Sequence, residues 1–517
     1  MHNITSKSYL NNYIQTYLWH GISIIMNLAS MFIVIPLITD NSVVYGIYSV
    51  CISTAMFLSY ADLGFVSAGI KYAGESYARG DHKDELKYYG FSGFILFIFV
   101  AIIATIYLLF SYNPSILIKG IEDSKYLSIA SSLLLIQAIF SFNTVVQRFV
   151  TGVFQVRIEQ YIYQRINIVG SLLKISSVFY FFSPGKYDII GYFLFFKIIE
   201  LITLLIGVLI ISQKYQLPII QLFKAFKFDN HVYNKTKGLA FSSLFVTLMW
   251  ILYYELDLIV IGKYFGAKSV AIYALAFTIM KFLRSLSSVI FSPFQNRYNH
   301  YVGLKNFEGM KILLTKVILF SMPIFVLVVL SIIILNKNIV LAWAGNEYVH
   351  SGTILFILAI NFMYSFVVIP GANMFVALER IKEMYWLNFI MVVVFWSGIL
   401  LTKSILGVNS FAIFKLISGT IAMLFYLKVL LGFLDMKILK FLKQTIYRLI
   451  TPIIIQVSFL LLVIGYLPEI KGKYNLMIVV GTGGVATIIG FITLYLSSTY
   501  YRSEFHLYLS KLSVGKK

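Results

Sequence analysis

The chain has 517 residues, of which 59% are hydrophobic and only 12% are charged, and its mean hydropathy is +0.85. A water-soluble protein of this length needs far more polar residues to cover its surface, so the composition excludes a soluble domain and predicts a polytopic membrane protein. The formal net charge is +21, and the single cysteine, Cys51, excludes an internal disulfide.

Apolar runs of about 20 residues, the length that crosses a bilayer as a helix, recur along the chain. Backbone groups in lipid must pair within their own segment, so we expect an all-α fold. The first apolar run is too long for a signal peptide and is expected to be retained. In chain order we predict fourteen transmembrane helices, at about 13–38, 43–66, 91–111, 127–150, 160–182, 188–212, 238–262, 268–292, 313–336, 350–370, 384–403, 408–431, 448–467 and 474–497.

The lysines and arginines predict the orientation of these helices. With both termini in the cytoplasm, the inner loops carry 27 of these cations and the outer loops carry nine. Cytoplasmic loops of membrane proteins are enriched in cations, so the asymmetry favours an even number of spans with both ends cytoplasmic. Because topology explains most of the positive charge, we expect no nucleic-acid partner. We expect the basic loops to lie against anionic membrane lipids.

An internal repeat is indicated by two segments that are 225 residues apart. The sequences YGIYSVCISTAMFLS at 45–59 and VAIYALAFTIMKFLR at 270–284 share an Ile-Tyr pair and a Phe-Leu pair at equivalent places. Repeated halves around a central cavity are typical of secondary transporters, with the substrate site near the midplane. We therefore predict a six-helix bundle at 1–212, a basic cytoplasmic linker at 213–237, a second, pseudo-two-fold related six-helix bundle at 238–431, and two extra helices with a cytoplasmic tail at 432–517.

A few cations fall inside the predicted spans, where an ion needs a partner or a water-filled cavity. Lys281 and Arg284 are three residues apart in the eighth span and share a helix face, so that face must meet an anion, an acid or water. Arginine and lysine together suit a phosphate or a pyrophosphate. The candidate substrate-binding residues are Lys174, Lys197, Lys281, Arg284 and Lys415.

Acidic residues in or beside the spans either balance these cations or carry a coupling ion. Lys197 and Glu200 are three apart in the sixth span, so an ion pair is the alternative to a binding role. Glu255 and Asp257 lie about 200° apart around a continuous helix, so one can pair with a cation while the other titrates. Asp62 ends the second span, where it either braces the following loop or takes part in gating. Charge balance and ion coupling are both open for Asp62, Glu200, Glu255 and Asp257.

The sequence contains no motif for a metal, a nucleotide or a catalytic reaction. The seven histidines are scattered, and none has a metal-binding spacing with another. The glycine-rich segment 481–490 lacks the lysine of a phosphate-binding loop and is typical of close helix packing. We therefore expect no metal site, no cofactor, no catalytic residue and no enzymatic activity. Transport would be driven by a gradient or by downhill substrate flow.

Several segments resemble a known family. The segment 45–81, with its Asp-Leu-Gly and Arg-Gly-Asp sequences at 62–64 and 79–81, is similar to the second span and following loop of polysaccharide-unit flippases. These flippases belong to the multidrug/oligosaccharidyl-lipid/polysaccharide exporter superfamily. The same resemblance extends to later span regions of the family, at 253–277, 341–360 and 371–389.

This resemblance implies two six-helix bundles that open alternately to either side of the bacterial cytoplasmic (inner) membrane. It implies a substrate, undecaprenyl pyrophosphate carrying an oligosaccharide, that moves from the inner to the outer leaflet for O-antigen or capsule assembly. Family members carry cations in the cavity, which implies a binding role for the five candidate cations. A polysaccharide polymerase and a chain-length regulator are the candidate protein partners.

Other functions are open beside this one. A proton- or sodium-coupled multidrug antiporter of the same fold would need an acidic cavity for cationic drugs, whereas the deep cations here outnumber the deep acids. A lipid II flippase would carry a substrate of nearly the same chemistry, so charge does not separate it from a flippase for other oligosaccharide units. A scaffold that does not transport would have no need for Lys281 and Arg284 on one helix face.

Overall fold

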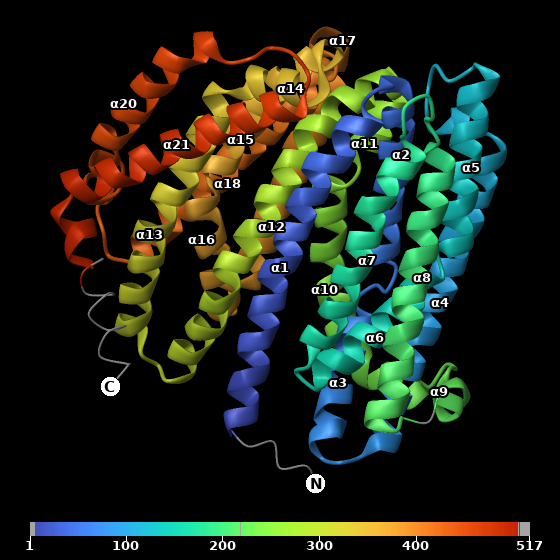
Figure 1. Ribbon diagram of the computed structural model, residues 1–517. Coiled ribbons are helices and arrows are strands. Elements are labelled where there is room, and N and C mark those ends of the chain that lie inside the picture. Colours follow the sequence, from blue (N-terminus) through green and yellow to red (C-terminus); the bar gives the residue numbers. More distant parts are fainter. Residues whose placement is uncertain (1–5, 218, 505, 507–517) are drawn as a thin grey trace. The chain divides into compact units, whose positions relative to one another are not determined.

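The computed structural model describes residues 6–217, 219–504 and 506, and this part of the chain is helical with no strand (Figure 1). The chain divides into two compact units, Met1–Ala271 (unit 1) and Ile272–Lys517 (unit 2). Among the described residues, nine helices are long and apolar enough to cross a membrane, and two bent helix pairs raise this number to eleven. The prediction of an all-α polytopic membrane protein is confirmed.

Unit 1 contains eleven helices in its described part. Their bounds are α1 (Ser6–Ile38), α2 (Ser42–Ser59), α3 (Phe65–Ala78), α4 (His82–Tyr112), α5 (Ser124–Phe140), α6 (Asn143–Val156), α7 (Gln160–Phe181), α8 (Ile189–Tyr215), α9 (Ile219–Ala225), α10 (Asn230–Tyr254) and α11 (Asp257–Phe265), with a 3-10 turn η1 (Pro114–Ile116). Within this unit, α1 packs along α7 and α3 packs along α4, while α4 also contacts α5, α6 and α9. The short helix α9 lies at one end of the unit (Figure 1).

The chain passes from unit 1 into unit 2 within α12 (Ala267–Gly303). The helices that follow are α13 (Phe307–Ile334), α14 (Asn336–Ala344), α15 (Val349–Met363), α16 (Ser365–Ala377), α17 (Ile381–Leu406), α18 (Asn409–Phe433), α19 (Ile438–Gln444), α20 (Ile446–Val463) and α21 (Lys473–Ser497), with 3-10 turns η2 (Asn346–Tyr348) and η3 (Ile464–Tyr466). In unit 2, α17 packs along α18, α20 packs along α21, and α13 contacts α15, α20 and α21.

Each of the fourteen predicted spans coincides with a helical segment of the described chain, although some segments are bent or broken. The fourth predicted span is the pair α5 and α6, which meet at 44°, and the tenth is the pair α15 and α16, which meet at 46°. The seventh predicted span is divided into α10 and α11. Hydropathy therefore located the spans but not their internal breaks.

Asparagine and aspartate side chains begin several of these helices. The first N–H groups of a helix have no partner within it, and a short side-chain oxygen at the preceding residue accepts one of them. This cap is formed by Asn41, Asp81, Asp123, Asp188, Asp229 and Asn306. The helix starts are thus encoded locally, independently of tertiary contacts.

The helix boundaries repeat along the chain with the offset of 225 that the sequence indicates. α2, α4 and α5 begin at Ser42, His82 and Ser124, and α12, α13 and α15 begin 225 residues later, at Ala267, Phe307 and Val349. α7 and α17 end at the same offset, at Phe181 and Leu406. The two capping residues Asp81 and Asn306 are also equivalent. The internal repeat is therefore much clearer in the helix boundaries than in the residue identities.

One difference between the two halves of the repeat concerns α12. α12 is continuous over 37 residues, whereas the equivalent part of unit 1 is divided into α2 and α3. At the break, Leu63 and Gly64 both have positive φ, 47° and 84°, and the amide of Phe65 donates to the Asp62 carbonyl at 2.8 Å. The left-handed conformation costs a non-glycine residue about 1–2 kcal/mol. The second span, predicted to extend to residue 66, therefore ends at Ser59.

The basic linker 213–237 is anchored to unit 1 by its apolar residues. A Cβ atom on Gly90 of α4 would lie 2.3 Å from the carbonyl oxygen of Ala225, so only glycine allows α9 to approach so closely. One residue further on, the ring of Phe226 packs edge-on against Phe94 and Phe97, with centroids 5.9 and 5.7 Å apart. The linker is therefore part of the packing of unit 1.

A close approach within unit 1 can be tested at Gly46 of α2. A Cβ atom there would lie 1.9 Å from the backbone oxygen of Ala267. We expect Gly46→Ala to destabilise the protein by about 1–3 kcal/mol, because overpacking forces the backbone apart. Thermal unfolding of the purified protein in detergent should show a lower Tm.

The matched control for this substitution is Gly21→Ala in α1, where no described atom lies within 4 Å of the new methyl group. Alanine favours a helix over glycine by up to about 1 kcal/mol, so the control Tm should stay equal or rise. Equal Tm values for both variants would contradict the close approach of α2 to the start of α12.

Candidate functional site

Three of the predicted substrate-binding cations surround one aromatic ring in unit 2. The distances to the ring centroid of Phe277 are 4.9 Å from Lys281 Nζ, 5.3 Å from Lys415 Nζ and 6.0 Å from Arg284 Cζ. Lys281 and Arg284 follow Phe277 by one and two turns of α12, while Lys415 comes from α18. Cations at these distances are attracted by the negative face of the ring. We call these three cations and Phe277 the unit 2 cluster.

Lys415 is the most buried member of the unit 2 cluster. It is only 2% exposed, and its ammonium also lies 4.8 Å from the ring centroid of Phe395 on α17. A cation–π contact contributes about 0.5–2 kcal/mol. A buried ammonium beside two aromatic rings, in a helix of mostly apolar residues, makes Lys415 a candidate site residue.

A second group of charges lies in unit 1, on the facing helices α7 and α8. Lys197 Nζ lies 3.2 Å from Glu200 Oε2, so the ion pair considered from the sequence is formed. Lys174 Nζ lies 3.8 Å from the ring centroid of Phe196, and the charges of both Glu200 and Lys197 act on it. We call Lys174, Lys197 and Glu200 the unit 1 cluster. The unit 1 cluster consists of the ion pair between Lys197 and Glu200 and of one further cation, Lys174.

The predicted binding residues thus form two clusters, one in each unit. The repeat does not generate them. At the offset of 225, the positions equivalent to Lys281 and Lys415 are Met56 and Ile190, and the position equivalent to Lys197 is Ala422. Helix boundaries are shared between the halves, whereas the deep charges are specific to each half.

The acids that the sequence placed inside the seventh span lie at a helix break. α10 ends at Tyr254, Glu255 is its C-terminal cap, and Asp257 is the first residue of α11. Glu255 and Leu256 lie between the two helices, so the expected separation of about 200°, which assumed one continuous helix, stays a prediction. The first turn of a helix is favourable for a carboxylate, since its N–H groups and dipole attract negative charge. Glu255 and Asp257 are 4% and 1% exposed.

Asp62 lies in the break between α2 and α3 and is 9% exposed. Its carbonyl accepts the hydrogen bond from Phe65 that closes the left-handed turn of Leu63 and Gly64. This hydrogen bond uses the backbone and not the carboxylate, so a bracing role and a gating role of the Asp62 side chain both stay predictions.

The Arg-Gly-Asp sequence at 79–81 forms the turn between α3 and α4. Gly80 has a φ of 76°, which glycine adopts without strain, and the Asp81 side chain accepts the amide of Asp84 at 2.9 Å to begin α4. Arg79 donates to Ser76 Oγ at 3.1 Å, and Ser76 donates to Asp84 Oδ2 at 2.9 Å. This motif therefore has a local structural role in the described chain.

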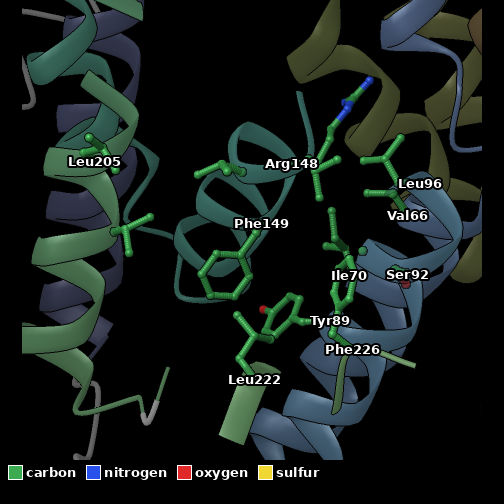
Figure 2. A pocket seen from close by; sticks show the side chains of 14 residues that line it. Val66, Ile70, Tyr89, Ser92, Leu96, Arg148, Phe149, Leu205, Leu222 and Phe226 are labelled. Atoms are coloured by element: carbon green, nitrogen blue, oxygen red, sulfur yellow. The ribbon is translucent and has the colours of Figure 1, made fainter. Parts of the chain in front are cut away.

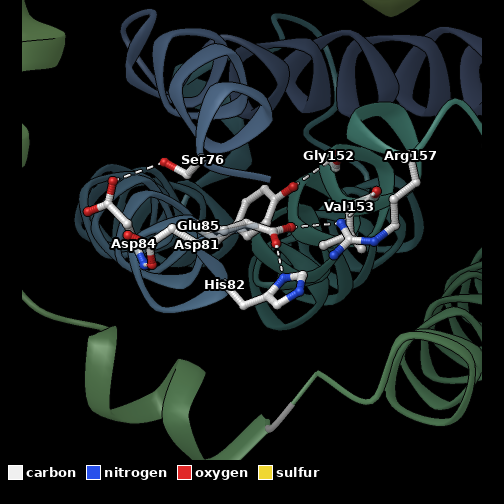
Figure 3. A network of polar contacts seen from close by, with 9 residues as sticks. Ser76, Asp81, His82, Asp84, Glu85, Gly152, Val153 and Arg157 are labelled. Atoms are coloured by element: carbon white, nitrogen blue, oxygen red, sulfur yellow. Dashed lines mark hydrogen bonds and ion pairs between the residues drawn. The ribbon is translucent and has the colours of Figure 1, made fainter. Parts of the chain in front are cut away.

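A buried ion pair beside this turn was not predicted from the sequence (Figure 3). Arg157 Nη1 donates to Glu85 Oε1 at 2.7 Å, and the two side chains are 4% and 0% exposed. Arg157 Cζ lies 4.5 Å from the ring centroid of Tyr77 and 4.7 Å from that of Tyr215. Burial alone would lower the pKa of Arg157, but the hydrogen bond and the charge of Glu85 raise it above its ordinary value. His82 Nδ1 also lies 3.2 Å from Glu85 Oε2.

This ion pair ties the α3–α4 turn to the end of α6. In the sequence, Arg157 is one of the loop cations that indicate the topology, and Glu85 lies 72 residues away, so no spacing connects the two residues. Lys214 extends the network, since its Nζ lies 2.5 Å from Glu159 Oε2, which also accepts from the Tyr215 hydroxyl. The network thus joins the ends of α4, α6 and α8 in unit 1.

Comparisons with known proteins give a shared fold at low sequence identity. No protein-family description matches the chain, and no curated protein is significantly similar to it in sequence. Among solved structures, the lipid II flippase MurJ matches with a TM-score of 0.65 and 16% identity, covering 94% of this chain and 99% of MurJ. A multidrug resistance MATE family transporter of the MOP superfamily matches with a TM-score of 0.57 and 13% identity, covering 79% of this chain and 98% of the transporter.

The chain therefore shares the fold of these two solved structures. The match to MurJ extends over nearly the whole of both chains, whereas the MATE transporter leaves about a fifth of this chain unmatched. At these identities the likeness concerns the fold. The substrate has to be argued from the charges of this chain.

Breaking the ion pair of Glu85 and Arg157 should be strongly destabilising. We expect Glu85→Gln to lower the free energy of unfolding by about 3–5 kcal/mol, because it leaves a buried guanidinium without its counter-charge. Glu75→Gln on the exposed face of α3 is the matched control and should have little effect. Thermal unfolding in detergent measures both variants. A Tm for Glu85→Gln equal to that of the control would show that the pair contributes no net stability.

Proposed function

We propose that this protein is a flippase that moves a polyprenyl-pyrophosphate-linked saccharide from the inner to the outer leaflet of the bacterial cytoplasmic membrane. The observation that carries the proposal is the unit 2 cluster, in which two lysines and an arginine lie within 6.0 Å of the centroid of one ring. The fold is shared with a lipid II flippase over 94% of this chain. Both observations favour a lipid-linked anionic substrate.

The chemistry of the clusters suits a pyrophosphate. The guanidinium of Arg284 can form two parallel hydrogen bonds to phosphate oxygens, while Lys281 and Lys415 supply point charges. The rings of Phe277 and Phe395 lie beside the ammonium groups, and a charge in such an apolar surrounding interacts with a phosphate more strongly than it would in water. The same residues would repel a cationic drug.

We assign a role in substrate binding to the unit 1 cluster as well. In it, Glu200 offsets one of the two lysines, so the group retains a positive charge overall. Alternating access requires that the substrate be held more weakly in one state than in another. The ion pair of Lys197 and Glu200 offers such a switch, because an arriving phosphate competes with the carboxylate for the lysine.

The remaining assignments follow from the sequence. We assign ion coupling or charge balance to Asp62, Glu200, Glu255 and Asp257, and we keep both termini in the cytoplasm because of the distribution of loop cations. Two six-helix bundles with two extra helices, α20 and α21, form the transport unit. The glycan unit would then be assembled into O-antigen or capsule by a polymerase, with a chain-length regulator.

A lipid II flippase is the second candidate function, because MurJ matches the fold over nearly the entire chain. Its substrate is also a lipid-linked saccharide, so the cationic clusters serve both functions equally. A multidrug antiporter fits less well. It would need acids rather than cations at the binding site, and the MATE structure covers only 79% of this chain.

Replacing Lys281 and Arg284 by glutamine tests the proposal. We expect the Lys281→Gln, Arg284→Gln double variant to reduce flipping by about tenfold or more, because each charge-assisted hydrogen bond to phosphate contributes about 1.5–3 kcal/mol. The measurement is transport of a fluorescent lipid-linked saccharide in proteoliposomes at equal protein content.

The control variant is Lys268→Gln, which removes an exposed lysine near the start of the same helix, α12. It should transport at the unaltered rate. Full activity of the double variant would leave the unit 2 cluster a structural feature and would remove the support for a pyrophosphate substrate.

Deleting the gene separates the candidate functions. Loss of one surface polysaccharide in viable cells is the result we expect. A lethal arrest with accumulated lipid II would favour the second candidate, and loss of a drug-resistance trait would favour the antiporter.

A further inference from the structure

An apolar cavity of about 290 Å³ lies within unit 1, at the end where the linker packs (Figure 2). It is bordered by α3, α4, α6, α8 and the short helix α9. Its walls include Leu96 of α4, Val146 and Phe149 of α6, Val208 of α8, and Leu222 and Phe226 of the linker. We call it the α9 cavity. Neither proposed cation cluster contributes a lining residue to it.

Two of the polar side chains at the α9 cavity already have hydrogen-bond partners in the protein, so the cavity offers few partners to water. Ser92 Oγ donates to the carbonyl of Phe65 at 3.2 Å, and Tyr89 donates to the carbonyl of Gly152 at 3.5 Å. Arg148 borders the cavity, but its guanidinium is directed away from Phe149 and Leu222 (Figure 2). A buried water needs two to four polar partners, and apolar cavities of roughly 150 Å³ stay dry and bind benzene. The α9 cavity therefore suits an apolar occupant.

The cavity reaches the apolar surface of α8. Leu205 lines it and is 51% exposed. Ile202 and Leu209, on the same face of α8, are 44% and 58% exposed, which is typical of a helix face in contact with acyl chains. In a multi-pass membrane protein, acyl chains are the apolar molecules that surround such a face at the highest concentration.

Two lysines accompany the apolar wall that the linker supplies. Leu222 and Phe226 are directed into the cavity, while Lys224 and Lys227 in the same segment are exposed. The close packing of Ala225 on Gly90 of α4 holds this segment in place. Gly90 is eight residues from the start of α4, about 12 Å along the helix, and directly precedes the span predicted from residue 91. An apolar cavity beside exposed cations at this depth matches a phospholipid tail and an anionic headgroup.

We propose that the α9 cavity binds one acyl chain of an anionic phospholipid, whose phosphate lies against Lys224 and Lys227. The bound lipid fixes the linker to α4, α6 and α8 and makes the packing of this end of unit 1 dependent on the lipid composition of the membrane. The proposal does not depend on the transported substrate.

Photocrosslinking tests this site directly. The full-length protein is reconstituted in nanodiscs that contain phosphatidylglycerol with a diazirine on its acyl chain, irradiated, and digested for peptide mapping. We expect labelled peptides from α6, α8 and the linker, including Leu222 and Phe226. Val208→Phe fills the cavity and should reduce this labelling about tenfold, because a packed apolar site does not accept both a ring and a chain.

The matched control is Leu209→Phe, one residue further along α8, which is 58% exposed and does not line the cavity. It should retain the labelling. Val146→Phe fills the cavity from α6, so the test stands if one filling variant does not fold. Labelling of the linker peptides that both folded filling variants leave unchanged would overturn the proposal.

The headgroup is tested by the same diazirine chain on phosphatidylcholine and by Lys224→Gln, Lys227→Gln. Both changes should reduce labelling several-fold, while Lys237→Gln, an exposed lysine on α10, should not. Equal labelling by the two lipids would refute an anionic headgroup. Displacement by undecaprenyl phosphate, but not by excess phosphatidylglycerol, would assign the cavity to the substrate tail and overturn the proposal.

Discussion

A charge inside a membrane must find a partner, a ring or water, and this constraint organises the whole protein. The hydrocarbon core does not solvate ions, so each deep charge limits how its helix can pack. In this chain the solutions are of three kinds. Lys197 pairs with Glu200, Lys281 and Lys415 lie over the ring of Phe277, and Asp257 stands at the start of a helix.

The repeat and the charges have separate origins in this fold. Helix starts and caps recur at an offset of 225, because both halves need the same spans and turns. The deep cations do not recur, and the residues equivalent to Lys281 and Lys415 are apolar. The common scaffold accounts for the likeness to MurJ and MATE structures at 16% and 13% identity. The deep charges of the two clusters therefore differ between the halves of that scaffold.

The end of unit 1 where the linker packs combines two further kinds of interaction. The buried pair of Glu85 and Arg157 is a strong polar contact whose partners depend on each other, while the packing of Ala225 on Gly90 is a steric fit. Together these two contacts hold the α3–α4 turn and the linker against the helices of unit 1, although hydropathy identifies both segments only as connections.

The amino-acid sequence by itself located the apolar helical segments and indicated the repeat, since hydropathy over about 20 residues and caps such as Asp81 are local properties. It also identified the deep cations, because a lysine in an apolar run is visible without a structure. Only the tertiary structure decided that Lys415 joins Lys281 at one ring and that Glu85 meets Arg157 across 72 residues. Only the structure also shows that the seventh predicted span is divided into two helices at Glu255. Contacts between helices and breaks within them depend on what packs alongside, and that information is not contained in any local stretch of the chain.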